Sequence, residues 1–264
     1  MLFFLKLGGS LITNKNKPHT SRNQIIHQIA NELLMALEKS PDLKLLIGHG
    51  SGSFGHVPAN LYKTRAGVST SEEWQGFLEV RNEASALNKI IIDIFRKEGL
   101  PTIAFHPSSM VIAKNRKILK WEISPIEEAI KSNLIPVIYG DVIFDLSLGG
   151  TILSTEELFF HLSPLLQPKR ILLAGIEEGV WEDFPERRKM IHAINTTNFV
   201  NFSQTLGGSS YIDVTGGMHS KVETMLSLIK KLPFVDVMIF SGKKPMNVFN
   251  ALTGKTLGTM IKIS

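Results

Sequence analysis

The stretch that most constrains the fold is Gly48–His56, which follows directly on the apolar run Leu43–Ile47 and reads Gly-His-Gly-Ser-Gly-Ser-Phe-Gly-His. A short apolar run followed by glycines predicts a buried strand that ends in a turn. Glycine has no Cβ, so the backbone N–H groups of such a turn stay open to an approaching anion. Phosphate is the ligand expected at this turn.

The spacing of these glycines also matches G-x-G-x-x-G, the fingerprint of dinucleotide-binding folds. A dinucleotide fold requires the turn to open a helix at once, and Pro58 is expected to come too early for an uninterrupted helix. Such a fold also requires an acidic residue at the end of the next strand. Here Glu73 instead forms a capping box with Thr70, which predicts the start of a helix. A dinucleotide-binding fold is therefore not expected.

Two other phosphate-binding signatures are absent from the sequence. Val57, which follows the glycine stretch, fits the glycine-rich loop of protein kinases. The chain has, however, no V-A-I-K, H-R-D or D-F-G sequence, which a protein kinase also requires. Gly254–Thr256 supplies the tail of a Walker loop, whereas Phe249 occupies the position of its first glycine. The glycines therefore predict phosphate binding on a different fold.

The composition is that of a globular chain whose 264 residues, 43% of them hydrophobic, are enough for a large core. The absence of cysteine excludes disulfides and thiolate metal sites, and favours a reducing compartment or a hot habitat. Lys6 interrupts the apolar start of the chain, so a signal peptide is not expected, and no apolar run has membrane-spanning length. We expect a cytoplasmic protein without a membrane partner.

The formal charge of +5 suits an anionic ligand and is also compatible with nucleic acid. The basic residues are, however, scattered over separate segments with few aromatic residues between them, which is typical of solvated faces. A nucleic-acid partner is therefore not expected.

Strand and helix signals alternate along the chain, which predicts an α/β fold with a mainly parallel sheet covered on both faces. The longest helix is expected from Thr70 to about Glu98, and the segments 111–121 and 142–153 are expected to be hairpins. Further helices are expected to begin near Thr20 or Ser21, Ser124, Ser154, Gly217 and Asn247. Further strands are expected at 2–7, 43–47, 103–105, 135–139, 170–174, 235–240 and 259–263, with an irregular stretch before Gly217.

Four separated segments together resemble the amino acid kinase superfamily and, within it, the isopentenyl phosphate kinase family. They are Leu5–Thr13 with Lys15, His49–His56, Tyr139–Val142 and Asp213–Lys221. The resemblance implies a single domain over 1–264 with a three-layer αβα sandwich, which usually forms a homodimer. It implies ATP-dependent phosphorylation of isopentenyl phosphate to isopentenyl diphosphate in isoprenoid precursor synthesis. The acceptor is then expected to bind to a lobe at about 1–168, and the nucleotide to a lobe at about 169–264.

The reaction implied by this resemblance brings two anions together. A phosphate monoester has a second pKa of about 6 and is largely dianionic at neutral pH, so it needs no general base to act as a nucleophile. Cations and N–H donors must instead hold both anions in line and stabilise the charge of the transition state. Mg²⁺ is expected to arrive with ATP, and no metal ligand is predicted in the protein.

The resemblance implies that four basic residues are catalytic. Lys6 is expected to meet the transferred phosphoryl group, Lys15 to stabilise the transition state, and His56 to donate a hydrogen bond to the acceptor phosphate. Lys221 lies one turn after Gly217 at a helix start, where ATP phosphates are expected. The residues by themselves also permit structural roles. Lys6 could be a solvated lysine at a strand end, and Lys15 could belong to a polar loop. His56 could cap its loop, and Lys221 could be an exposed lysine on a helix.

Further residues complete the predicted site. The expected ATP contacts are Lys6, Gly8, Gly9, Ser10, Gly52, Gly217 and Lys221. The expected acceptor contacts are Ser51, Gly55, His56, Gly150, Phe77 and Val80. Phe77 or Val80 is expected to touch the prenyl chain, although an apolar helix stripe is more often core. His49 is expected to cap its loop, and Asp141 either to orient the lysines or to serve as a turn residue, while Asp213 has no assigned role.

Two segments depart from the family pattern. Ser154–Glu157 reads Ser-Thr-Glu-Glu where the family often has Ser-Gly-Asp-Asp, so the longer carboxylates are expected to shift the lysine network. Ala174–Trp181 replaces the usual Thr-Asp-Val-Asp-Gly-Val-Tyr, which leaves the nucleotide preference open. Two alternatives are compatible with the fold: a kinase of another small phosphate or phosphonate such as fosfomycin, and a non-catalytic nucleotide-binding protein. Retention of the four basic residues argues against the second.

Overall fold

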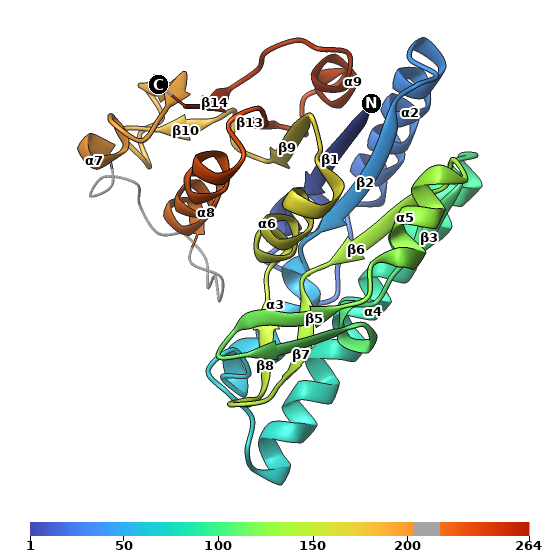
Figure 1. Ribbon diagram of the computed structural model, residues 1–264, viewed down its shortest axis with the longest axis vertical. Helices are drawn as coiled ribbons and strands as arrows, with labels where there is room; N and C mark the ends of the chain where they lie inside the picture. Colours follow the sequence, from blue (N-terminus) through green and yellow to red (C-terminus); the bar gives the residue numbers. More distant parts are fainter. Residues whose placement is uncertain (203–216, 264) are drawn as a thin grey trace.

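The computed structural model of the chain describes residues 1–202 and 217–263 (Figure 1). Within these residues, an eight-stranded sheet forms the centre of the fold. Its strand order is β12 (Ala193–Ile194), β14 (Thr259–Ile261), β13 (Asp236–Ser241), β9 (Arg170–Gly175), β1 (Leu2–Leu7), β2 (Lys44–His49), β6 (Ile135–Tyr139) and β3 (Thr102–Ala104). Neighbouring strands are parallel except for β13 and β14. The predicted mainly parallel sheet is confirmed.

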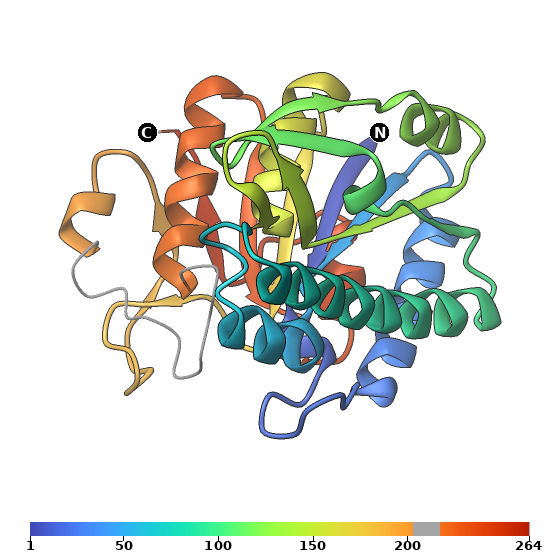
Figure 2. The same ribbon diagram turned by 90° about the horizontal axis from the view of Figure 1, so that it is seen from below.

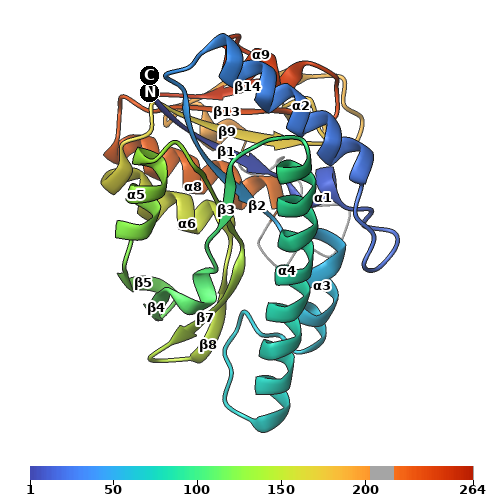
Figure 3. The same ribbon diagram turned by 90° about the vertical axis from the view of Figure 1, so that its right-hand side faces the viewer.

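Helices cover both faces of this sheet. One face packs against α2 (Asn23–Lys39), α4 (Ser71–Lys97) and α9 (Asn247–Leu252), and the other against α5 (Ser124–Lys131), α6 (Thr155–Leu166) and α8 (Gly217–Lys231). In Figure 3, α2 and α9 lie on one side of the strands, and α6 and α8 on the other. Side chains alternate along β1, so Leu5 and Leu7 are buried under α2 whereas Phe4 contacts Phe159 of α6. Lys6 therefore points toward α6.

The two predicted hairpins are confirmed, and they join into one smaller sheet that the sequence did not predict. This sheet has the order β5 (Lys117–Trp121), β4 (Val111–Lys114), β7 (Asp141–Asp145) and β8 (Gly149–Leu153), in which β4 and β7 are parallel. It lies below the main sheet in Figure 1 and is connected to β6 through Gly140. The smaller sheet and α4 bury a third apolar cluster, which includes Val80, Val142 and Ile152.

The expectation that Pro58 excludes an uninterrupted helix is wrong. The helix α3 (Gly52–Leu61) begins in the glycine-rich turn itself and contains Pro58. A proline inside a helix costs about 3 kcal/mol because it removes one hydrogen bond and crowds the preceding turn. Phe54, Pro58 and Ala59 are buried, and Figures 2 and 3 show α3 lying along α4. Burial of these apolar residues offsets the cost of the proline.

Of the other predicted helix starts, that of α4 is confirmed and that of α2 is wrong. The capping box of Thr70 and Glu73 is confirmed at the start of α4. The predicted cap at Thr20 or Ser21 is wrong, because α2 begins at Asn23 after Arg22, which makes no side-chain cap. A short helix, α1 (Gly9–Ile12), follows β1 directly. The segment expected to be irregular contains β10 (Val180–Trp181), β11 (Met190–Ile191), β12 and α7 (Phe199–Phe202).

Candidate active site

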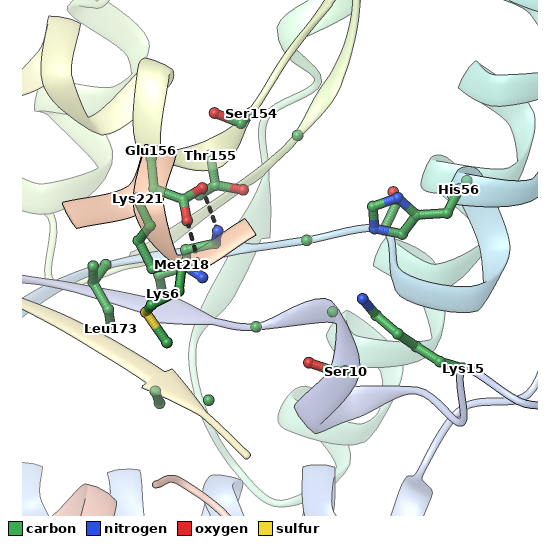
Figure 4. A pocket seen from close by; sticks show the side chains of 18 of the residues that line it. Lys6, Ser10, Lys15, His56, Ser154, Thr155, Glu156, Leu173, Met218 and Lys221 are labelled. Carbon is green, nitrogen blue, oxygen red and sulfur yellow. Dashed lines mark ion pairs between the residues drawn. The ribbon is translucent and has the colours of Figure 1, made fainter. Parts of the chain in front are cut away.

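A pocket opens at the carboxyl ends of the central strands, where ligands bind in open α/β sheets (Figure 4). Its wall is formed by the ends of β1, β2 and β9 and the starts of α6 and α8, together with residues of α3, α4, β8 and the loop that carries Lys15. The polar and backbone part of the wall comprises Lys6, Gly8, Gly9, Ser10, Lys15, Gly50, Ser51, Gly55, His56, Gly140, Ser154, Thr155, Glu156, Glu177 and Lys221. The four predicted catalytic residues, which come from four different segments, are therefore brought to one cavity.

Most of the predicted site residues line this pocket, and four do not. Those that line it are Lys6, Gly8, Gly9, Ser10, Lys15, Ser51, Gly55, His56, Val80 and Lys221. The four outside the lining are Gly52, Phe77, Gly150 and Gly217, all of which are described by the structure. Asp213, to which the sequence assigned no role, lies outside the described residues.

Some glycines of the Gly48–His56 stretch are required for close packing rather than for an open anion-binding turn. Gly52 has φ +51°, and a Cβ there would lie 2.1 Å from Thr13 Oγ1. A Cβ on Gly9 would lie 2.6 Å from the Gly52 nitrogen, so the two glycine turns are in direct backbone contact. A Cβ on Gly48 would overlap Thr155 of α6. The loops after β1 and β2 can meet at the pocket only because these side chains are missing.

Lys6 and Lys221 share one buried carboxylate, that of Glu156. Lys6 Nζ forms an ion pair with Glu156 Oε2, and Lys221 Nζ lies 3.7 Å from Glu156 Oε1 (Figure 4). Burial by itself would raise the pKa of Glu156, but the two ammonium groups outweigh it and hold the pKa below its usual value. Glu156 is therefore a site residue that sequence reasoning noted only as a departure from the family pattern.

The adjacent Glu157 has a structural function instead. Ser154 Oγ accepts a hydrogen bond from the Glu157 N–H, and Glu157 Oε2 accepts one from the Ser154 N–H, so the two form the capping box of α6. Both Glu157 oxygens also accept hydrogen bonds from Arg65, at 3.2 Å each. Of the two consecutive glutamates, one anchors the helix and the other faces the lysines.

Lys15 and His56 extend toward each other at the other end of the pocket in Figure 4. Lys15 lies on a loop that is closed by a hydrogen bond of 2.8 Å from the Asn14 N–H to the Thr20 carbonyl. His19 on the same loop lies 2.7 Å from a carboxylate oxygen of Glu83 on α4. The polar loop around Lys15 is therefore attached to the helices beside the pocket.

The apolar part of the pocket wall includes Ala59, Val80 and Ile152, which belong to the cluster between α3, α4 and the smaller sheet. Phe77 lies deeper in this cluster, and a Cβ on Gly150 would meet its ring at 2.8 Å. Val80 thus faces the cavity, whereas Phe77 and Gly150 support its wall. The polar surface of the pocket consequently combines the basic side chains with the carboxylates of Glu156 and Glu177, and one side of the pocket is apolar.

His49 and Asp141 are buried polar residues near the site that fix backbone. His49 Nδ1–H donates to the Gly50 carbonyl, while His49 Nε2 accepts a hydrogen bond of 3.0 Å from Asn88 Nδ2. Asp141 accepts hydrogen bonds from the N–H groups of Ser108 and Val142, and burial raises its pKa to about 6. These contacts agree with the predicted loop-capping role of His49. Asp141 is not a turn residue: it begins β7, where it is paired with Leu153, and its side chain fixes the backbone at Ser108.

His49 is expected to make stability depend on pH. Burial lowers its pKa from 6.5 to about 4, so the unfolded chain binds a proton more readily between these values. Its stabilising contribution is complete above pH 6.5 and is lost as the pH falls toward 4. We expect it to remove about 2 kcal/mol of unfolding free energy between pH 7 and pH 5. Urea unfolding at both pH values should show a smaller difference for His49→Gln, whose amide can still donate to Gly50; an equal difference would contradict the prediction.

Two negative findings concern the described residues alone. In residues 1–202 and 217–263 no group of three or more histidine, aspartate or glutamate side chains is arranged to hold a metal ion. Within the same part of the chain, no helix combines the length and the apolar character needed to cross a membrane.

Comparison with known proteins identifies the class to which this fold and site belong. Residues 1–241 match the amino acid kinase family, and the chain therefore belongs to that family. Its full-length similarity is to the isopentenyl phosphate kinases within it. The chain is 35% identical to the isopentenyl phosphate kinase of Methanocaldococcus jannaschii over 270 residues, which cover 100% of both chains.

Further relatives have the same name. The chain is 32% identical to the isopentenyl phosphate kinase of Methanothermobacter thermautotrophicus, with 98% of each chain covered. A solved isopentenyl phosphate kinase structure superposes with a TM-score of 0.83 at 28% identity, over 99% of this chain and 100% of the other. The family resemblance and the α/β sandwich expected from the sequence are thus confirmed.

Proposed function

We propose that this chain transfers the γ-phosphoryl group of ATP to isopentenyl phosphate and so forms isopentenyl diphosphate. The observation that carries the proposal is the single pocket lined by Lys6, Lys15, His56 and Lys221, with an apolar wall beside them. Its cations suit two phosphate groups, and its apolar side suits a short hydrocarbon chain. The full-length similarity to isopentenyl phosphate kinases supports the same reaction.

The proposed mechanism is an in-line transfer that relies on charge stabilisation. An oxygen of the acceptor phosphate attacks the γ-phosphorus, the bond from this phosphorus to the β-phosphate oxygen breaks, and ADP leaves. The acceptor is already dianionic, so no proton has to be removed. Lys6 meets the transferred phosphoryl group and Lys221 the nucleotide phosphates, while Lys15 stabilises the charge of the transition state and His56 donates a hydrogen bond to the acceptor phosphate.

Glu156 acts on this chemistry through the two lysines that it contacts. One carboxylate between two ammonium groups leaves a net positive charge for the phosphates, and it keeps both side chains folded toward the pocket. Gly9 and Ser10 supply backbone N–H donors at the start of α1, and Gly8, whose own N–H is bonded to the Ala174 carbonyl, lines the same part of the pocket. In this proposal Ser51 and Gly55 contact the acceptor, and Val80 meets the prenyl chain in front of Phe77 and Gly150. Gly52 and Gly217, which lie outside the pocket lining, support the glycine loop and the start of α8 beside the ATP phosphates.

The two substrates are assigned to different parts of the chain. We infer that residues 1–168 bind the acceptor and residues 169–264 the nucleotide, with β1 between the two sites. Mg²⁺ enters as the Mg-ATP complex. A homodimer and a cytoplasmic location remain predictions.

His56→Ala is expected to lower kcat/KM for isopentenyl phosphate by about tenfold to hundredfold, because a hydrogen bond to a charged group is lost. ADP release would be measured with Mg-ATP, with and without isopentenyl phosphate, for the wild type and the variant. The KM for ATP should change little, since His56 is assigned to the acceptor.

The same assay tests the alternatives. Turnover with fosfomycin but not with isopentenyl phosphate would assign another phosphorylated or phosphonate acceptor. Nucleotide binding without turnover of any acceptor would favour a non-catalytic protein. An unchanged kcat/KM in His56→Ala would remove His56 from the acceptor site.

A further inference from the structure

We propose that Glu177 binds a ribose hydroxyl group of the nucleotide and that Arg187 and Trp181 hold its carboxylate in position for this contact. The inference rests on the proposed function, because it assigns the nucleoside part of the same pocket. Glu177 lies in the segment whose departure from the family pattern left the nucleotide preference open.

Glu177 lies beside the loop assigned to the nucleotide phosphates. It lines the pocket two residues after β9 ends at Gly175. The Gly8 N–H donates a hydrogen bond of 2.8 Å to the Ala174 carbonyl, and a Cβ on Gly8 would lie 3.6 Å from the Gly175 Cα. The end of β9 therefore directly adjoins the glycine loop. A nucleotide whose terminal phosphates rest on that loop has its next part, the α-phosphate and ribose, near Glu177.

The carboxylate of Glu177 is held in a defined orientation. Arg187 Nε donates to Oε2 and Arg187 Nη2 donates to Oε1, each at 2.9 Å. Trp181 Nε1 donates to Oε2 at 3.0 Å. The two oxygens of a carboxylate can accept about four hydrogen bonds, so these three leave capacity on Oε1. The Glu177 side chain is 20% exposed, which allows a ligand to approach it.

The charge of Glu177 decides which ligand groups it can accept. The hydrogen bonds from Arg187 lower the pKa of Glu177, so its carboxylate is ionised at neutral pH and accepts hydrogen bonds only. It repels phosphate groups, which keeps the triphosphate at the lysine end of the pocket. The donors of ATP are the two ribose hydroxyls and the amino group of adenine, and the ribose is the nearer to the phosphates. Carboxylates bind ribose hydroxyls in the same way in dinucleotide folds.

The neighbouring Glu178 provides a matched control. It has the same charge and is next in sequence, but it is absent from the pocket lining and forms an ion pair of 2.6 Å with Lys244. Its side chain is 50% exposed. Glu178→Gln therefore removes the same charge without touching the proposed contact.

The test compares nucleotides that lack one donor each. Steady-state turnover of isopentenyl phosphate would be measured with ATP, 2′-deoxy-ATP, 3′-deoxy-ATP and purine riboside triphosphate, which lacks the amino group. The wild type is expected to prefer ATP over at least one deoxynucleotide by about tenfold to hundredfold in kcat/KM. Glu177→Gln should lose most of this preference, whereas Glu178→Gln should retain it. Thermal unfolding of both variants checks that they are folded.

Three results would overturn the proposal: equal use of ATP and both deoxynucleotides by the wild type, full retention of the preference in Glu177→Gln, or discrimination against only the analogue without the amino group. Calorimetric binding of ADP, 2′-deoxy-ADP and 3′-deoxy-ADP separates this inference from the reaction itself. If isopentenyl phosphate is not turned over, the proposed function fails, and the calorimetric preference still decides the role of Glu177.

Discussion

Lys6→Met is expected to lower kcat by about 10²-fold to 10³-fold, the range observed when one group that stabilises transition-state charge is removed. Lys6 leaves β1 on the face of α6 and reaches the pocket next to Gly8. Methionine retains most of the length and apolar volume of the lysine chain but not its charge. The loss should therefore appear in kcat, with a smaller change in the KM for isopentenyl phosphate. Coupled measurement of ADP release at saturating Mg-ATP, with isopentenyl phosphate varied from below to above its KM, gives both constants.

A control must separate the loss of catalysis from the loss of the ion pair between Lys6 and Glu156. In Lys6→Met the buried Glu156 retains Lys221, at 3.7 Å, as a partner, and some stability is lost because its nearer cation is gone. The double variant Lys6→Met with Glu156→Gln removes the buried carboxylate charge that has lost its nearer cation. It should recover stability in thermal unfolding while kcat stays low. Recovery of kcat in the double variant, or a kcat within threefold of wild type in the single one, would show that Lys6 does not act on the transferred group.

Glu32→Ala is expected to produce the largest loss of stability, about 3–5 kcal/mol of unfolding free energy. The Glu32 carboxylate lies on α2 and is buried, with 3% of the residue exposed. It accepts hydrogen bonds from the N–H groups of Met246, Val248 and Phe249 at 2.8–3.2 Å. Met246 caps α9 without a side-chain hydrogen bond, so a carboxylate from another helix replaces the usual cap. Alanine leaves all three donors without their acceptor.

Thermal and urea unfolding measure this loss, and the melting temperature should fall by about 10 °C. Glu32→Gln keeps one acceptor oxygen and should lose roughly half as much. Glu38→Ala on the exposed side of the same helix is the matched control and should change stability little. A loss below about 1 kcal/mol in Glu32→Ala would mean that solvent replaces the carboxylate at the start of α9.

Much of the local structure could be predicted because its causes lie within a few residues of each other. The capping box of Thr70 and Glu73, the stop after Lys97 and the period-two pattern of the hairpins all act at short range. The prediction failed at Pro58, where packing of α3 along α4 outweighs a local penalty. It also missed that the two hairpins share one sheet, since the pairing of β4 with β7 depends on contacts between distant segments.

In the candidate site, too, some residues could be predicted from the sequence, and the contacts between them could not. Sequence motifs selected the lysines and His56, and the pocket contains them all. Glu156 was noted in the sequence, but its contact with two lysines was not predictable, because the lysines belong to β1 and α8 and approach α6 only in the folded chain. Glu177 and Arg187 likewise meet only because the β10–β11 hairpin folds back on the end of β9.

The sequence by itself determined the class of fold, the longer strands and helices, and the basic and glycine-rich segments that point to phosphate. These follow from hydrophobic period, capping and backbone freedom, which act between neighbours along the chain. Only the tertiary structure decided which glycines serve packing, which glutamate caps a helix and which one faces the lysines. These outcomes depend on the direction of side chains from distant elements, and a shift of one residue along a strand or helix would reverse them.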